Sequence, residues 1–101
     1  MSVESLRLET QLAEGLETVV GRDLGSVPEV RYVLTERVPD SLTVWIAVDN
    51  PEEAVRRRTY ATELNLISAF PEVAFDFNLV SVLGRSPSQI ATGAHLAYSR
   101  T

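Results

Sequence analysis

The sequence predicts an α+β domain, built as a two-layer α/β sandwich in which helices cover one face of a mixed sheet. The segment Leu42–Leu83 has the pattern of a strand, a helix and a second strand. Such a βαβ unit has parallel strands and a right-handed crossover. A further apolar, strand-like segment, Val30–Val38, precedes it across the short turn at residues 39–41, so we expect an antiparallel hairpin there.

The composition is that of one ordinary globular domain. The chain has 101 residues, of which 45% are hydrophobic and 23% charged, and this length suits a single core. We expect one domain over residues 1–83 and a C-terminal tail over residues 84–101, as a short helix or an edge strand. No cofactor is expected, and the absence of Cys excludes disulfides and cysteine-based metal or redox sites.

Charge and hydropathy limit the partners that we expect. The net charge of −5 argues against a nucleic-acid partner, because phosphate backbones attract an excess of Lys and Arg. The N-terminus lacks the pattern of a signal peptide, and no apolar run approaches the ~20 residues that span a bilayer. We therefore expect a cytoplasmic protein with no membrane partner.

The first helix is predicted over residues 3–20, where leucines recur every four residues between positions 8 and 16. Gly21 and Gly25 are expected to stop it. In the strand that follows, strict alternation places Val33 on the side opposite Val30. In the next strand the aliphatic residues at even positions 42–48 are expected beneath the helices, which turns Trp45 and Ala47 to the other face.

The second helix is predicted to begin at residues 49–53, where an N-cap, a helix-initiating Pro51 and two glutamates coincide. It is expected to end at Phe70, before Pro71. The helix is apolar on two sides. We expect one side to face the sheet and the other to lie outside; the inner set is Ala54, Tyr60, Ala61, Leu64 and Ile67, and the outer set is Val55, Leu66, Ala69 and Phe70.

The last predicted strand alternates Phe75 and Phe77 with Asp76 and Asn78, which is the period of two of a half-buried strand. The resulting order α-β-β-α-β resembles a ferredoxin-like β-α-β-β-α-β chain that lacks its first strand. This truncated ferredoxin-like topology implies a three-stranded mixed sheet with both helices on one face and the other face open.

Residues with catalytic potential are few. His95 is the only histidine, and alone it makes neither a metal site nor a catalytic triad. Asp76 and Asn78 project from one strand face, but a hard cation needs six or more oxygen ligands. We predict no catalytic, cofactor-binding or metal-binding residue, and the sequence favours a protein without enzymatic activity. An enzyme stays open as an alternative, in which Asp76 and His95 would be brought together across a dimer interface.

The apolar residues left over after the core is filled suggest a function in association. We expect a small protein-interaction module, a homodimer that buries its open sheet face. Its expected interface consists of Trp45, Val33, Ala47, Val55, Leu66 and Phe70. The alternative is a small-ligand-binding or regulatory domain with a pocket between the open face and the tail, lined by Trp45, Asp76, Asn78 and Arg85.

Overall fold

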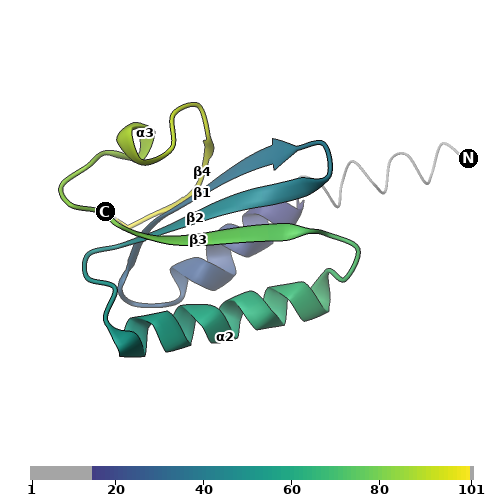
Figure 1. The fold of residues 1–101 in the computed structure, drawn as a ribbon, viewed down its shortest axis with the longest axis horizontal. Helices are drawn as coiled ribbons and strands as arrows, with labels where there is room; N and C mark the ends of the chain where they lie inside the picture. Colours follow the sequence, from purple (N-terminus) through teal and green to yellow (C-terminus); the bar gives the residue numbers. More distant parts are fainter. Residues whose placement is uncertain (1–14, 101) are drawn as a thin grey trace, which may run out of the picture.

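The computed structural model describes residues 15–100, and these form an α+β fold with a single four-stranded sheet and three helices (Figure 1). The beginning of the predicted first helix and Thr101 lie outside the described residues. After a helix over residues 15–25 come β1 (Val30–Val38), β2 (Ser41–Val48), α2 (Glu53–Ala69), β3 (Phe75–Ser81), α3 (Pro87–Ile90) and β4 (His95–Ser99).

The strand order in the sheet is β3-β2-β1-β4. β1 is antiparallel to β2, and β2 is parallel to β3, which confirms the predicted hairpin and crossover. The predicted count of three strands is wrong, because the C-terminal segment adds β4 antiparallel to β1. Residues 95–99 are therefore part of the same sheet, and β3 and β4 occupy its two edges. α2 and the first helix lie on one side of the sheet, and α3 lies on the other (Figure 1).

A bulge at the start of β1 corrects the predicted facing of Val33. Val30 pairs with Val48, but the next pair joins Tyr32 to Ala47, so one extra residue of β1 is accommodated there. After this shift Val33 lies opposite Ile46, fully buried in the core beneath the helices. Strict alternation fails at the bulge, and Leu34 takes the place beside Trp45 that we expected for Val33.

The rotation of α2 about its axis is the reverse of our prediction. Val55, Thr59 and Leu66 are buried, whereas Tyr60, Leu64 and Ile67, which we expected against the sheet, are exposed. Thr59 tolerates burial because its hydroxyl donates to the carbonyl oxygens of residues 55 and 56. The buried stripe 55-59-62-66-70 contains no charged residue, while the opposite stripe begins with Glu53 and Arg57.

Three of the four residues of the predicted outer set of α2 accordingly lie in or against the core, and only Ala69 is exposed. Val55 and Leu66 belong to the main buried cluster, and Phe70 packs against it, half-buried. Arg58 of α2 forms an ion pair with Glu29, which precedes β1. This contact favours the observed orientation of α2 about its axis.

The first helix continues through Gly21 to residue 25. A Cβ atom at Gly21 would overlap the carbonyl group of Ala97, and one at Gly25 would overlap the ring of Tyr98. These glycines therefore allow the helix to pack closely against β4, and Gly21 does not end the helix as we expected.

The sheet face opposite α2 is not open, because the chain must cross it to pass from β3 at one edge to β4 at the other (Figure 1). Val82 and Ala91 of the crossing segment are buried. On the sheet itself Ala47 and Leu34 are buried, and Trp45 is half-buried. The expected bare face around Trp45 is therefore largely covered by the chain itself.

Candidate functional site

The edge formed by β3 is a strand with one unpaired side and a row of apolar side chains. Phe75, Phe77 and Leu79 all lie on the helix-facing side and are half-buried. The rings of Phe75 and Phe77 stack with their centroids 4.9 Å apart. None of the seven residues of β3 is Lys, Arg or Pro, the residues that commonly protect an exposed strand edge from pairing.

The backbone of β3 presents a defined set of free groups at this edge. The carbonyl of Ala74 accepts a hydrogen bond from Leu42, and the N–H of Val82 donates to Val48. Both partners are on the β2 side. Since backbone groups of successive strand residues point to alternate sides, the N–H and C=O groups that face outward are those of Phe75, Phe77, Leu79 and Ser81.

A stripe of exposed apolar side chains runs along α2 beside this edge. Tyr60 is 59% exposed, Leu64 44% and Ile67 45%, and their spacing of four and three residues places them on one helical face. A groove of about 430 Å³ separates α2 from β3, with Phe77 and Leu79 as its lining on the β3 side. We call the stripe, Phe77, Leu79 and the groove between them the α2–β3 surface.

Two charged residues of this groove, Arg56 and Glu63, have no ionic partner among residues 15–100. Glu63 is half-buried, and this burial raises the pKa of its carboxyl group. Arg56 uses its Nε to donate to the carbonyl oxygen of Pro51, 2.9 Å away. Arg57, by contrast, pairs with Glu53 one turn earlier at 2.5 Å. The groove thus carries one unpaired acid and one unpaired base, seven residues apart.

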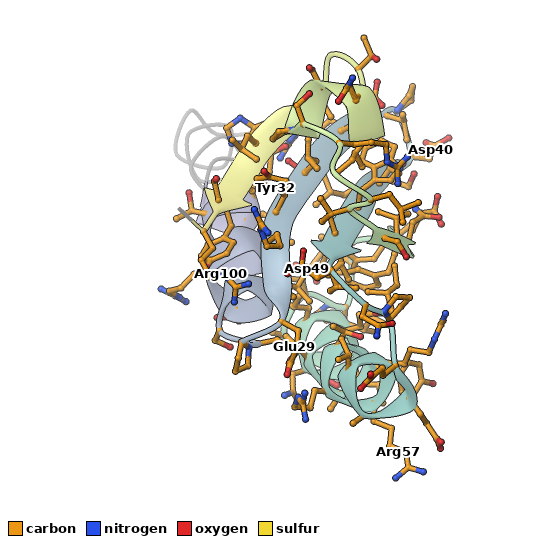
Figure 2. All side chains as sticks on the ribbon, turned by 90° about the vertical axis from the view of Figure 1, so that its left-hand side faces the viewer. Glu29, Tyr32, Asp40, Asp49, Arg57 and Arg100 are labelled. Atoms are coloured by element: carbon orange, nitrogen blue, oxygen red, sulfur yellow. The ribbon has the colours of Figure 1, made fainter. Side chains whose placement is uncertain are left out.

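A second group of charges lies at the end of the sheet where β1 begins and β2 ends. Figure 2 shows Glu29, Asp49 and Arg100 near one another at this end. Arg31 and Arg100 pair with Asp49, at 3.2 and 3.8 Å. Glu29 pairs with Arg58; this hydrogen bond lowers the pKa of Glu29 and raises that of Arg58. Each of these charged side chains has a partner of opposite charge within the group, as is typical of ion pairs that stabilise a fold.

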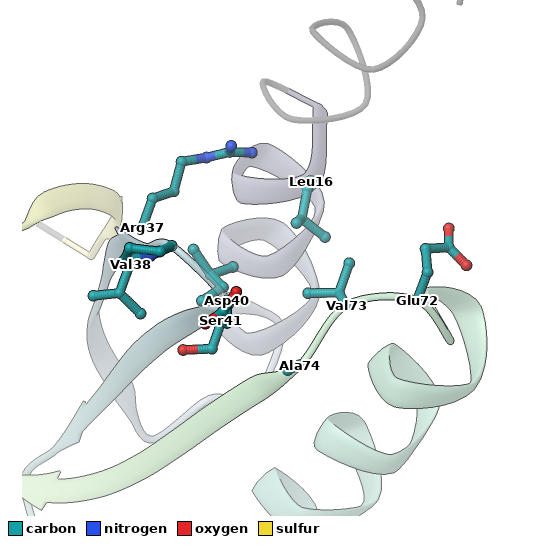
Figure 3. A pocket seen from close by; sticks show the side chains of 10 residues that line it. Leu16, Arg37, Val38, Asp40, Ser41, Glu72, Val73 and Ala74 are labelled. Atoms are coloured by element: carbon teal, nitrogen blue, oxygen red, sulfur yellow. The ribbon is translucent and has the colours of Figure 1, made fainter.

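A smaller cavity of about 250 Å³ lies between the first helix, the β1–β2 turn and the segment before β3 (Figure 3). Leu16 and Val73 contribute apolar walls, and Arg37, Asp40 and Glu72 contribute charges. Arg37 pairs with Glu17 of the first helix at 3.5 Å. Ser41, Asp40 and Glu72 line this cavity, but among the described residues no hydrogen bond joins the Ser41 hydroxyl to either carboxylate.

The predicted ligand residues do not converge on one point. Asp76 is exposed, and the side-chain amide of Asn78 donates to the carbonyl oxygens of Asp76 and Val44, at 3.2 and 3.4 Å. Arg85 donates through its Nε to the carbonyl oxygen of Val82 at 3.1 Å, and its other guanidinium nitrogens include a donor to Ser81. Arg85 therefore caps the end of β3 instead of facing a ligand.

The described residues provide neither a metal site nor a membrane-spanning helix. Within residues 15–100 no group of three or more His, Cys, Asp or Glu side chains is arranged to hold a metal ion. His95 is exposed at the start of β4. No helix in the described part of the chain combines the length and apolar character needed to cross a membrane.

The residues of the α2–β3 surface were missed by sequence reasoning, which placed Tyr60, Leu64 and Ile67 in the core. The signal that distinguishes the two sides of α2 is charge. Glu53 and Arg57 extend the stripe of Tyr60 and Leu64 toward the N-terminus, and charged residues on a helical face indicate solvent.

Comparison of the chain with family models, curated proteins and solved structures found no match. The ferredoxin-like resemblance therefore stays a prediction about topology.

Proposed function

We propose that this domain is a small protein-interaction module, without catalytic activity of its own, that associates with a second copy of itself through the α2–β3 surface. The observation that carries the proposal is the exposed apolar stripe of Tyr60, Leu64 and Ile67 on α2, whose first member, Tyr60, lines a groove together with residues of the unpaired strand β3. Contiguous apolar patches on small domains are typical of association surfaces, and unpaired strand edges are templates for pairing with another chain.

A second copy is the occupant that suits the charges of this surface. In a two-fold dimer the same patch is used by both chains, so each patch must be complementary to itself. The α2–β3 surface has an apolar centre with one unpaired base, Arg56, and one unpaired acid, Glu63. When such a patch meets its own copy about a two-fold axis that lies between the two charges, Arg56 of each chain is opposite Glu63 of the other.

The sheet face around Trp45 has less support as the interface. Leu34 and Ala47 on that face are already buried within the chain, so a partner would remove little additional apolar area from water there. Three of the exposed large apolar side chains, Tyr60, Leu64 and Ile67, share one face of α2, whereas Val38, Leu83 and Leu96 lie on separate segments.

The proposal is tested by the solution mass at tens of micromolar, measured by light scattering after size exclusion. The expected mass of the wild-type protein is that of two chains, and the expected mass of Ile67→Lys is that of one. Leu96→Lys is the matched control, because Leu96 on β4 is 42% exposed, close to the 45% of Ile67, but lies at the other edge of the sheet. A single-chain wild type, or equal dissociation by the two variants, would contradict the proposal.

A further inference from the structure

We infer that the two copies join edge to edge: β3 of one chain pairs antiparallel with β3 of the other about a two-fold axis at Asn78, and Arg56 of each chain pairs with Glu63 of the other. This inference rests on the proposed self-association and specifies its geometry. The product is one continuous eight-stranded sheet, with both α2 helices side by side on the same face.

The backbone of β3 determines which registers are possible. In an antiparallel ladder, residues whose N–H and C=O groups point to the partner must stand opposite one another. The outward residues of β3 have odd numbers from 75 to 81. A two-fold axis at Asn78, the centre of β3, places Phe77 opposite Leu79 and Phe75 opposite Ser81, so that every outward residue of the strand has a partner.

The side chains of β3 are compatible with this register. Phe77 of each chain meets Leu79 of the other on the helix-facing side, and aromatic–aliphatic cross-strand pairs are favourable. The only charged residue of β3, Asp76, stands opposite Val80 of the other chain. The two aspartates therefore do not face each other, and no like charges oppose the pairing.

The position of α2 extends the same symmetry to the helix. Because α2 connects two parallel strands, it runs antiparallel to β3. The groove places Phe77 and Leu79, which flank Asn78, beside the part of α2 that contains Arg56 and Glu63. A two-fold axis at Asn78, perpendicular to the sheet, passes beside α2 near the midpoint between Arg56 and Glu63. The two α2 helices of the dimer are then antiparallel, and Arg56 of each helix lies toward Glu63 of the other.

The charges provide independent support for this arrangement. Glu63 is half-buried without a cationic partner among residues 15–100, although a carboxylate removed from water is stabilised by an opposite charge. Within the described part of the chain, the side chain of Arg56 bonds only the backbone carbonyl oxygen of Pro51. Two cross-chain pairs satisfy all four groups at once, and a strand from an unrelated protein lying on the β3 edge would not.

Charge exchange tests the helix contact. Arg56→Glu and Glu63→Arg are each expected to raise the dimer dissociation constant by about tenfold or more, since each places like charges across the interface. An equal mixture of the two variants is expected to restore association, because the mixed dimer contains two opposite-charge pairs. Arg22→Glu and Asp23→Arg, on the first helix, are the controls and are expected to change nothing, alone or mixed.

A single cysteine tests the register. The chain has no Cys, and residues at position 78 of the two chains form a non-hydrogen-bonded pair with a Cα separation of about 4.5 Å, which suits a disulfide. Asn78→Cys is therefore expected to form covalent dimers in glutathione disulfide. Asp76→Cys, on the same face of β3, is expected to remain uncrosslinked because its counterpart is Val80.

The outcomes separate this inference from the proposed function. If the wild type has the mass of two chains but the mixture does not recover, or Asp76→Cys crosslinks as fast as Asn78→Cys, the chains associate in another geometry and the inference is wrong. If the wild type has the mass of one chain, both the inference and the proposed function are wrong.

Discussion

β4 and β3 lie at opposite edges of one sheet and differ in length, in regularity and in what packs against them. β4 has five residues, and its pairing with β1 is interrupted by a register shift. The first helix approaches it closely at Gly21 and Gly25. β3 has seven residues in unbroken register with β2, and its helix-facing aromatic residues are half-buried.

The two edge strands, β4 and β3, therefore end the sheet in different ways. At β4, a short irregular strand and a closely packed helix limit the room for another chain, as edge protection requires. At β3 the strand is regular and apolar, and the groove beside it separates α2 from the edge. The domain thus has one protected edge and one edge that is suited to pairing, and in the proposed self-association this asymmetry would limit the assembly to two chains.

The largest effect is expected from a pair of proline substitutions in β3. The N–H of Val80 points to β2, so Val80→Pro removes a ladder hydrogen bond and should lower the free energy of unfolding by about 2–3 kcal/mol. The N–H of Leu79 points outward, so Leu79→Pro should leave the ladder with β2 intact but abolish association. Urea unfolding and light scattering measure the two effects. Equal loss of stability in both variants would show that the outward side of β3 is not free.

A smaller effect is expected from adding a methyl group where the first helix meets β4. Gly21→Ala should lower the free energy of unfolding by about 1–3 kcal/mol, because the new Cβ meets the backbone of Ala97, which cannot move away cheaply. Gly15→Ala is the control, since no described atom lies within 4 Å of its Cβ position; it should be neutral or slightly stabilising. A harmless Gly21→Ala would mean that the helix does not close this edge tightly.

The smallest effect concerns the two sides of α2 and appears in acid. Arg58 lowers the pKa of Glu29 below its ordinary value of 4.5, so this pair stabilises the folded chain above that value, and the contribution is lost as the pH falls through the lowered pKa. Burial raises the pKa of Glu63. Protonation of Glu63 therefore has the opposite effect on the free energy of unfolding, because it favours the folded single chain as the pH falls.

Urea unfolding of Leu64→Lys, in which the chain is expected to be single and the new lysine is not one helical turn from Glu63, measures these contributions between about pH 6 and pH 3. Adding Glu29→Gln should reduce the loss of stability in acid, and adding Glu63→Gln should slightly raise stability at neutral pH. Identical pH profiles in the three proteins would contradict both assignments.

Much of the secondary structure follows from local pattern. The β1–β2 hairpin, the helix initiated near Pro51 and the strand that alternates Phe75 with Asp76 were all predicted close to their observed bounds. Each depends on residues adjacent in the chain, namely a period of two, a turn or a set of helix-start signals. The candidate site was not predicted, because its position depends on which side of α2 faces the sheet.

Local pattern in the amino-acid order was enough to specify the class of fold, the parallel crossover and the surplus of apolar side chains, because these follow from periodicity and composition. The residue displaced by the bulge in β1 and the attachment of β4 were resolved only by the folded chain. They depend on contacts between distant residues, such as Gly21 with Ala97, and no local period encodes such contacts. The buried side of α2 has a local signal in the charges of Glu53 and Arg57 on the opposite stripe, and the folded chain adds the pairing of Arg58 with Glu29. Because that side is buried, Tyr60, Leu64 and Ile67 remain exposed, while the face around Trp45 is largely covered.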